Sequence, residues 1–455
     1  MADNLSKTRL DSWKEIAEYL GRDVRTVIRW EKDKGLPVHR IPGGKRHAVF
    51  AYREEIDAWL ASGTPINHED STAPRSGARL RVIAGLAALV LLLALVGFIW
   101  FNPLRAPSIA RVTFAGTTLQ TWDERGRLAW TYALPRRVAP LQPQEVERRV
   151  VFADLDGDGV REILTAPPFM ETSREAPAQG ILYCFSPRGH LLWTYQPESS
   201  LSFGGKRFDG AWGITDLVVV PGRPADSLWV AVAHIPWWPS FVVRMDAQGR
   251  ASRRFVNSGT IQRLNYLRTG SRLYLLAGGV NNEYDSSGML AVLDAEAEAV
   301  TSPQTPGSAF HCDGCPGRLP VRYFFFPRSE LHQLLTHWPN TVNYITVSPD
   351  NVVEVRTVET AEWHGPAGLY TFSPSFELLA ATREDAYWDI HRKLEREGKL
   401  THTVEKCPER VRPLTVRSWS AENGWAEVRP TQWPPPSGFP AAAQKAAAPA
   451  TKRSD

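Results

Sequence analysis

The sequence predicts a multidomain protein with a small helical domain, one transmembrane helix and a large all-β domain. Three observations predict this. Residues 8–62 are basic and carry helix signals, residues 82–101 are apolar and uncharged, and residues 107–430 alternate short β-prone stretches with turns. The chain has 455 residues, more than one typical domain of roughly 100–200 residues, so at least two folding units are expected. Lys7–Arg53 holds twelve Lys/Arg against six Asp/Glu, and this local positive charge indicates a polyanionic partner.

Residues 12–32 carry the signals of two helices joined by a tight turn. Ser12 and Glu15 can form a capping box, Gly21 supplies the turn, and Asp23 can cap the second helix. On the outward side of the second helix, arginine can pair with guanine and lysine can neutralise phosphates. The expected DNA contacts on this helix are Arg25, Thr26, Arg29 and Lys32.

The next segment, "LPVHRIPGGKRHAVFAY" (36–52), predicts a hairpin with a basic tip. Lys45, Arg46 and His47 would stand on this tip against the phosphate backbone, and "REEIDAWLAS" (53–62) would close the domain with a helix. "RTVIRWEKDKGLP" followed by "YREEIDAWL" resembles the winged helix-turn-helix domains of the MerR/excisionase type. The resemblance implies that the second helix enters the major groove of double-stranded DNA while the hairpin, the wing, contacts its backbone. The alternative is a small helical domain whose basic face is only solvated or binds a protein.

Residues 63–81 are polar and rich in Ser, Thr, Pro and Gly, which predicts a flexible linker. The twenty uncharged residues 82–101 would span about 30 Å as a helix, the thickness of a bilayer core, so they predict a transmembrane helix rather than a buried core helix. We therefore expect a single-pass protein of the bacterial inner (cytoplasmic) membrane. Its N-terminus would be cytoplasmic and its C-terminal domain periplasmic, since the basic N-terminal domain would meet DNA in the cytosol.

Residues 107–430 contain a repeated hairpin. "LQTWDERGRLAWTY" (119–132) recurs as "LYCFSPRGHLLWTY" (182–195), and a weaker copy occupies residues 242–255. Strand-built repeats of about 45–60 residues predict a β-propeller, here of about six or seven blades, with a β-sandwich as the alternative. The "G-x-L-x-W-T-Y" hairpins resemble the repeats of quinoprotein-like propellers. The Pro/Ala-rich tail, residues 431–455, is expected to be disordered.

The segment "FADLDGDGVREILTA" (152–166) predicts a cation site. Carboxylates at alternate positions can converge on one hard cation where glycines let the backbone coil, and Thr165 at the twelfth position excludes an EF-hand. The segment resembles the calcium loops of FG-GAP repeats. The resemblance implies a structural Ca²⁺ whose ligands are Asp154, Asp156, Asp158, the Val160 carbonyl and Glu162. An Asp/Gly-rich turn without a metal is the alternative.

Four cysteines remain, Cys184, Cys312, Cys315 and Cys407. Cys312 and Cys315 have the C-x-x-C spacing, for which a small-loop disulfide is preferred over free thiols or redox catalysis, because a zinc site would need a second pair. Residues 384–400 predict a surface helix on which His391 is solvated.

Together these features resemble the layout of membrane-tethered one-component transcriptional regulators. Such a protein would couple an extracytoplasmic propeller that senses an unknown ligand or protein to a cytosolic DNA-binding domain, and tethering would favour a homodimer. The alternative is an envelope binding or adhesion protein whose N-terminal domain docks a cytosolic protein. An enzyme is not expected, because no nucleophile, base and orienting acid stand together in the sequence.

Overall fold

The computed structural model describes residues 9–40, 48–62, 108–170, 180–235, 238–362 and 365–434. The chain divides into two compact units, Met1–Asn102 and Pro103–Asp455. The predicted linker 63–81, the apolar segment 82–101 and most of the tail lie outside the described residues.

The described residues of the small unit form three helices and a three-stranded sheet in the order β1-β3-β2. Its elements are β1 (Arg9–Leu10), α1 (Trp13–Tyr19), α2 (Val24–Lys34), β2 (His39–Arg40), β3 (Val49–Tyr52) and α3 (Arg53–Ala61). Ser12 and Asp23 both cap their helices: Glu15 N donates to Ser12 Oγ at 3.2 Å, and Thr26 N donates to Asp23 Oδ1 at 3.1 Å. The predicted capping box forms only in part, because the Glu15 carboxylate accepts from Asp11 N at 2.9 Å. Gly35 ends α2 at φ 66°, a left-handed conformation that favours glycine.

The core of the small unit is built where these elements meet. Ile16 of α1, Val27 of α2, Ala51 of β3 and Ile56 of α3 are each fully buried. Ala17 is also buried, and its small side chain leaves room for the second helix beside the first. These residues form the centre of the core, whereas Val24 at the start of α2 is exposed.

In the described part of the large unit, mostly antiparallel strands are arranged in five main sheets. The first sheet contains β4 (Ile109–Ala115), β5 (Thr118–Asp123) and β6 (Leu128–Ala133), and the second contains β7 (Val150–Ala153), β8 (Glu162–Thr165), β9 (Leu182–Phe185) and β10 (Leu191–Tyr195). The third contains β13 (Trp212–Val220), β14 (Ser227–His234), β15 (Ser240–Met245) and β16 (Ala251–Asn257), with β20 (Val300–Thr301) parallel at its edge.

The fourth sheet contains β17 (Ile261–Thr269), β18 (Arg272–Asn281), β19 (Ser287–Asp294), β22 (Arg322–Phe326), β27 (Val416–Ser420) and β28 (Gly424–Val428). The fifth contains β23 (Val342–Val347), β24 (Val353–Val358), β25 (Ala367–Phe372) and β26 (Leu378–Arg383). A smaller sheet is formed by β11 (Leu201–Phe203), β12 (Lys206–Phe208) and β21 (Cys312–Asp313). The helices are α5 (Pro143–Arg149), η1 (Asn282–Tyr284), α6 (Glu330–Leu335), α7 (Asp385–Arg396), η2 (Val404–Lys406) and α8 (Pro408–Val411).

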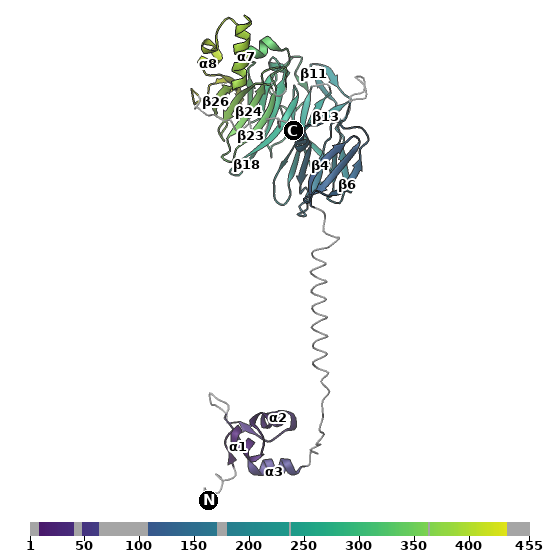
Figure 1. Cartoon of the computed structure of the whole chain (residues 1–455), viewed down its shortest axis with the longest axis vertical. Helices are drawn as coiled ribbons and strands as arrows, with labels where there is room; N and C mark the ends of the chain where they lie inside the picture. The colour runs from purple at the N-terminus through teal and green to yellow at the C-terminus, as the bar shows by residue number, and fades with distance from the viewer. Residues whose placement is uncertain are drawn as a thin grey trace, which may run out of the picture. The chain divides into compact units, whose positions relative to one another are not determined.

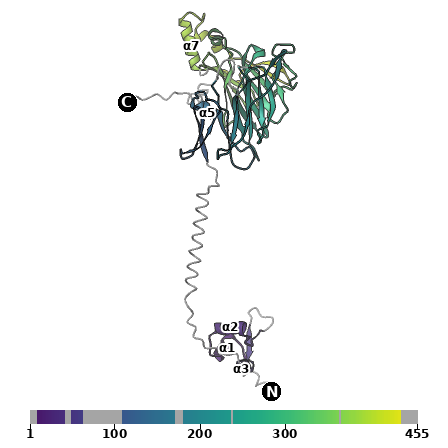
Figure 2. The ribbon, with the colours of Figure 1, turned by 90° about the vertical axis from the view of Figure 1, so that its right-hand side faces the viewer.

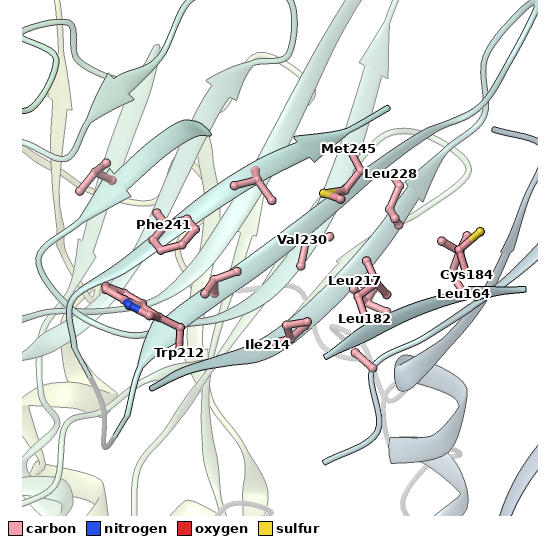
Figure 3. Close-up of a cluster of buried hydrophobic side chains, with 14 of the residues drawn as sticks. Leu164, Leu182, Cys184, Trp212, Ile214, Leu217, Leu228, Val230, Phe241 and Met245 are labelled. Carbon is pink, nitrogen blue, oxygen red and sulfur yellow. The ribbon is translucent and has the colours of Figure 1, made fainter. Parts of the chain in front are cut away.

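Successive sheets pack face to face, as strand β14 shows. Leu228 and Val230 point into the cluster shared with the second sheet (Figure 3), to which Val232 also belongs. Trp229 and Ala231 point into the cluster shared with the fourth sheet. Because side chains alternate along a strand, this pattern means that the third sheet is buried on both faces. The sheets follow one another across the unit in chain order, and α7 lies at its far end (Figures 1 and 2).

The large unit is therefore all-β and propeller-like, but the prediction of six or seven blades is wrong. The described residues of the large unit form five main stacked sheets and one smaller sheet. The helix predicted within residues 384–400 forms as α7, and η2 and α8 follow it before β27 and β28 extend the fourth sheet. Local turn signals indicate hairpins, but they do not determine how many sheets the hairpins make.

The predicted fold class also needs correction for its transmembrane helix. Among the described helices none is long and apolar enough to cross a membrane. The longest of them, α7, has 12 residues and covers about 18 Å, against about 30 Å of hydrocarbon. The predicted single-pass helix, the inner-membrane location with its cytoplasmic and periplasmic sides, and the inner membrane as a partner are therefore not supported.

Candidate nucleic-acid interface and calcium loop

Helix α2 presents a row of cationic side chains. Arg25, Arg29 and Lys32 are all exposed, and their spacing of four and three residues places them on one side of the helix. Val27, on the opposite side, is fully buried in the core of the small unit. Three of the four contact positions predicted on this helix are therefore accessible to a partner.

Thr26, the fourth predicted contact, contributes to the helix cap. It is half-buried, and its Oγ1 donates to Asp23 Oδ2 at 2.7 Å while its backbone N–H donates to Oδ1. The Thr26 hydroxyl and N–H hold the pKa of the Asp23 carboxyl below its usual value. The hydroxyl proton of Thr26 therefore fixes the start of α2 and is not free to be donated to a nucleic acid.

The hairpin β2–β3 lies beside this helix. Its register pairs His39 with Phe50, and Arg40 donates to Glu31 of α2 at 2.9 Å. His39 Nε2 lies 2.6 Å from a carboxylate oxygen of Glu55 in α3, so the base of the hairpin is tied to two helices. The predicted basic tip, Lys45, Arg46 and His47, lies outside the described residues.

The acidic loop 154–161 connects β7 to β8. Ala153 and Glu162 are register partners at its ends, so the loop closes a hairpin. Asp154 accepts from the N–H groups of Gly157 at 2.8 Å and Gly159 at 2.9 Å. These glycines have φ of 79° and 82°, and this left-handed backbone is what lets the loop coil around the Asp154 carboxylate.

Three of the predicted ligands converge. Asp154, Asp156 and Glu162 each offer a carboxylate oxygen, and these oxygens lie within 4.8 Å of one another. Asp158, a fourth predicted ligand, is not in this group, and its carboxylate accepts the Val160 N–H at 2.7 Å. Burial raises the pKa of Glu162, and the neighbouring charges of Asp156 and Asp158 act in the same direction. A set of carboxylate oxygens in a coiled loop fits a hard cation such as Ca²⁺.

The acidic loop is braced by a residue that the sequence did not single out. Asp226 Oδ2 accepts from Asp154 N at 3.0 Å, and Asp226 N donates to the Asp154 carbonyl at 2.7 Å. Gly157 also approaches this segment, since a Cβ atom there would lie 3.1 Å from the Pro224 carbonyl oxygen. Asp226 is 72 residues from Asp154, so no local pattern could have revealed the contact.

The small-loop disulfide preferred for the C-x-x-C pair forms. Cys312 and Cys315 form a disulfide, whereas Cys184 and Cys407 are free and buried.

No family model matches the chain, and no curated protein matches it. Among solved structures, the chain is similar to the Dos1 propeller, with 11% identity, a TM-score of 0.32, and coverage of 62% of this chain and 71% of that one. It is also similar to a protein of unknown function from Bacteroides caccae, with 9% identity, a TM-score of 0.22, and coverage of 60% and 93%. Likeness at this level carries no argument, so the propeller-like character follows from the stacked sheets alone. None of the comparisons supports the predicted MerR/excisionase type for residues 10–61.

Proposed function

We propose that this chain is a DNA-binding transcriptional regulator. In this proposal the small unit binds double-stranded DNA and the large unit binds a ligand or partner that controls it. The observation that carries the proposal is the row of exposed cations, Arg25, Arg29 and Lys32, on a helix whose opposite side is buried. Such a helix can be presented to a groove without disturbing the core beneath it.

The chemistry of this row suits DNA in two ways. A guanidinium can donate two parallel hydrogen bonds to the O6 and N7 atoms of guanine in the major groove, and each such pair contributes about 1–3 kcal/mol of discrimination. Cations that meet phosphates release counterions, so binding weakens as salt rises. The β2–β3 hairpin beside the helix would reach the sugar–phosphate backbone through Lys45, Arg46 and His47.

The large unit would serve as the sensor rather than as an enzyme. Its stacked sheets form a rigid scaffold, and a structural Ca²⁺ held by Asp154, Asp156 and Glu162 would stiffen the hairpin at the start of the second sheet. Asp226 joins that loop to the third sheet, so the ion would also steady the packing between these sheets. Two chains acting as a dimer would bind paired half-sites more tightly than one, by effective concentration.

The test is a DNA-binding titration of the full chain against a pool of genomic fragments at two salt concentrations. We expect sequence-selective binding that is weakened by salt and lost in the Arg25→Ala/Arg29→Ala variant. A matched control is Arg127→Ala/Arg250→Ala, which removes two exposed arginines, each paired with an aspartate at i−4, from the large unit. This control should bind DNA as the unchanged chain does.

Two outcomes would overturn the proposal. One is the absence of salt-dependent DNA binding, and the other is equal loss of binding in both double variants, which would mean that only net charge matters. If DNA is not bound but the exposed row of α2 captures a protein, the small unit is a protein-docking domain.

A further inference from the structure

Four potential metal ligands that are distant in sequence meet beside α7. Glu330 lies at the start of α6, His391 in α7, His402 in the segment after it, and Cys407 at the start of α8. One ligand atom from each, a carboxylate oxygen, two imidazole nitrogens and a thiol sulfur, all lie within 4.8 Å of one another. The helices α7 and α8 lie together at one end of the large unit (Figure 1).

Two of the six distances between these atoms match those of a tetrahedral zinc site, and a third is close. Ligand nitrogens and oxygens at about 2.0–2.1 Å from zinc are about 3.3 Å apart, and sulfur at about 2.3 Å is about 3.6 Å from them. In the structure, the Nε2 atoms of His391 and His402 are 3.3 Å apart, and His402 Nε2 is 3.2 Å from Glu330 Oε2. Cys407 Sγ lies 4.0 Å from the same oxygen, slightly longer than the ideal separation.

Burial distinguishes this cluster from an ordinary group of surface side chains. His391 and Cys407 are fully buried, so the expectation that His391 is a solvated helix residue is wrong. Tyr387 and Leu394 lie one turn to either side of His391 on α7, and both are buried in one hydrophobic cluster. This side of the helix therefore faces inward. The side chains of His402 and Glu330 are 19% and 36% exposed, which leaves a path for an ion to enter.

The two imidazoles face each other through the same ring atom. A neutral imidazole has one nitrogen that donates and one that accepts, so this contact satisfies both rings only if one of them carries its proton on Nε2. A cation between them would use the lone pairs of both Nε2 atoms and the charges of the thiolate and carboxylate. Nitrogen and sulfur ligands select zinc-type ions, whereas the all-oxygen set of the acidic loop suits Ca²⁺.

We propose that Glu330, His391, His402 and Cys407 bind one Zn²⁺ ion. Four protein ligands fill the tetrahedral shell, so the site is structural and leaves no open position for substrate. The ion fastens α6, which lies between the fourth and fifth sheets in the chain, to the α7–α8 insertion. This inference does not depend on whether the small unit binds DNA.

The neighbouring contacts hold the ligands in place. Ser329 caps α6 by accepting from His332 N at 3.1 Å, and Glu330 N donates to Glu409 of α8 at 2.8 Å. Val404 N, in the turn between His402 and Cys407, donates to Glu395 of α7 at 3.3 Å. These contacts link α6 to α8 and the turn to α7 before any ion binds, which lowers the entropic cost of binding.

The test measures zinc in the full chain, purified without a metal-affinity step, loaded with excess Zn²⁺ and dialysed. We expect about one zinc ion per chain, and loss of at least about nine-tenths of it in Cys407→Ala. The matched control is Cys184→Ala, which removes the other free, fully buried thiol and should keep its zinc. Replacement with Co²⁺ should give a thiolate-to-cobalt charge-transfer band in the unchanged chain and the control but not in Cys407→Ala.

The more exposed ligand supplies a second variant if Cys407→Ala does not fold. His402→Gln changes a partly exposed side chain, and it should lose zinc while keeping the circular dichroism of the unchanged chain. The proposal is overturned if the unchanged chain holds no zinc after dialysis. It is also overturned if a folded Cys407→Ala or His402→Gln chain retains as much zinc as the Cys184→Ala control.

Discussion

The indole ring of Trp130 in the first sheet covers Gly189, the turn glycine of the second sheet. Trp130 Nε1 donates to the Pro187 carbonyl at 2.9 Å, and a Cβ atom at Gly189 would lie 2.7 Å from Trp130 Cδ2. The next hairpin repeats the arrangement, because Trp193 Nε1 donates to the Ala247 carbonyl at 2.9 Å. The repeated "W-T-Y" hairpin is thus a device that joins one sheet to the next.

This contact predicts unequal effects of two glycine substitutions. Gly126 and Gly189 occupy equivalent turns with φ of 72° and 86°, but only Gly189 lies under a tryptophan. Gly126→Ala should cost about 1 kcal/mol of unfolding free energy through its backbone conformation. Gly189→Ala should cost about 1–3 kcal/mol more, because its methyl group overlaps the indole ring. Equal shifts in a denaturant titration would contradict the contact.

Arg383 carries a buried charge network. Its side chain is 1% exposed, and it lies 2.8 Å from Glu409 and 3.4 Å from Glu359, whose side chain is fully buried. Arg383→Met should destabilise the large unit by about 3–5 kcal/mol, because Glu359 would be left as an unpaired buried charge. Adding Glu359→Gln should recover part of this loss.

The control for this prediction is Arg392→Met, which removes an arginine from an exposed ion pair on α7. Exposed ion pairs contribute little to the free energy of unfolding, so the unfolding midpoint of Arg392→Met should stay close to that of the unchanged chain. A similar loss in both arginine variants, measured by chemical unfolding, would show that burial of the Arg383 network is not the cause.

Calcium should stabilise the chain through the acidic loop. An ion that binds only the folded state adds about 2.7 kcal/mol when its concentration is a hundred times its dissociation constant, so the thermal midpoint should rise with Ca²⁺. Asp156→Asn should remove most of this rise, because it takes one of three converging carboxylates from the site.

Asp246→Asn is the matched control for calcium. Asp246 also accepts N–H groups in a hairpin turn, from Gln248 and Arg250, but it is not among the converging carboxylates. Its variant should keep the full response to Ca²⁺ in a thermal unfolding series. A response that survives in Asp156→Asn would place the ion elsewhere.

Thr26 should act on folding rather than on DNA contact. Thr26→Val removes the hydroxyl that donates to Asp23 and should cost the small unit about 0.5–1.5 kcal/mol, the net contribution of a typical hydrogen bond. Its DNA affinity, measured below the unfolding midpoint, should remain close to that of the unchanged chain, unlike that of Arg25→Ala/Arg29→Ala. A large loss of affinity at full folding would restore Thr26 as a contact residue.

The features predicted correctly from the sequence depend on interactions between residues close in the chain. Ser12 and Asp23 each cap a helix by accepting the N–H of the residue three positions further along the chain. Gly126 and Gly189 lie in the turns of the repeated hairpins, and the glycines of the acidic loop let it coil between its two strands. Each of these needs only local backbone geometry and short side chains. The C-x-x-C disulfide belongs with them, since its two cysteines are three residues apart.

The sequence alone therefore determined the local features of this protein, namely its caps, turns, hairpins, acidic loop and cationic helix. Tertiary structure decided the number of sheets, the covering of Gly189 by Trp130, and the meeting of Glu330 with Cys407 across 77 residues. The sequence offers His391, His402 and Cys407 in one short segment but does not show that they face inward. Contacts between distant segments depend on how whole sheets and helices pack, and a pattern that repeats every two or four residues cannot encode which partner lies opposite.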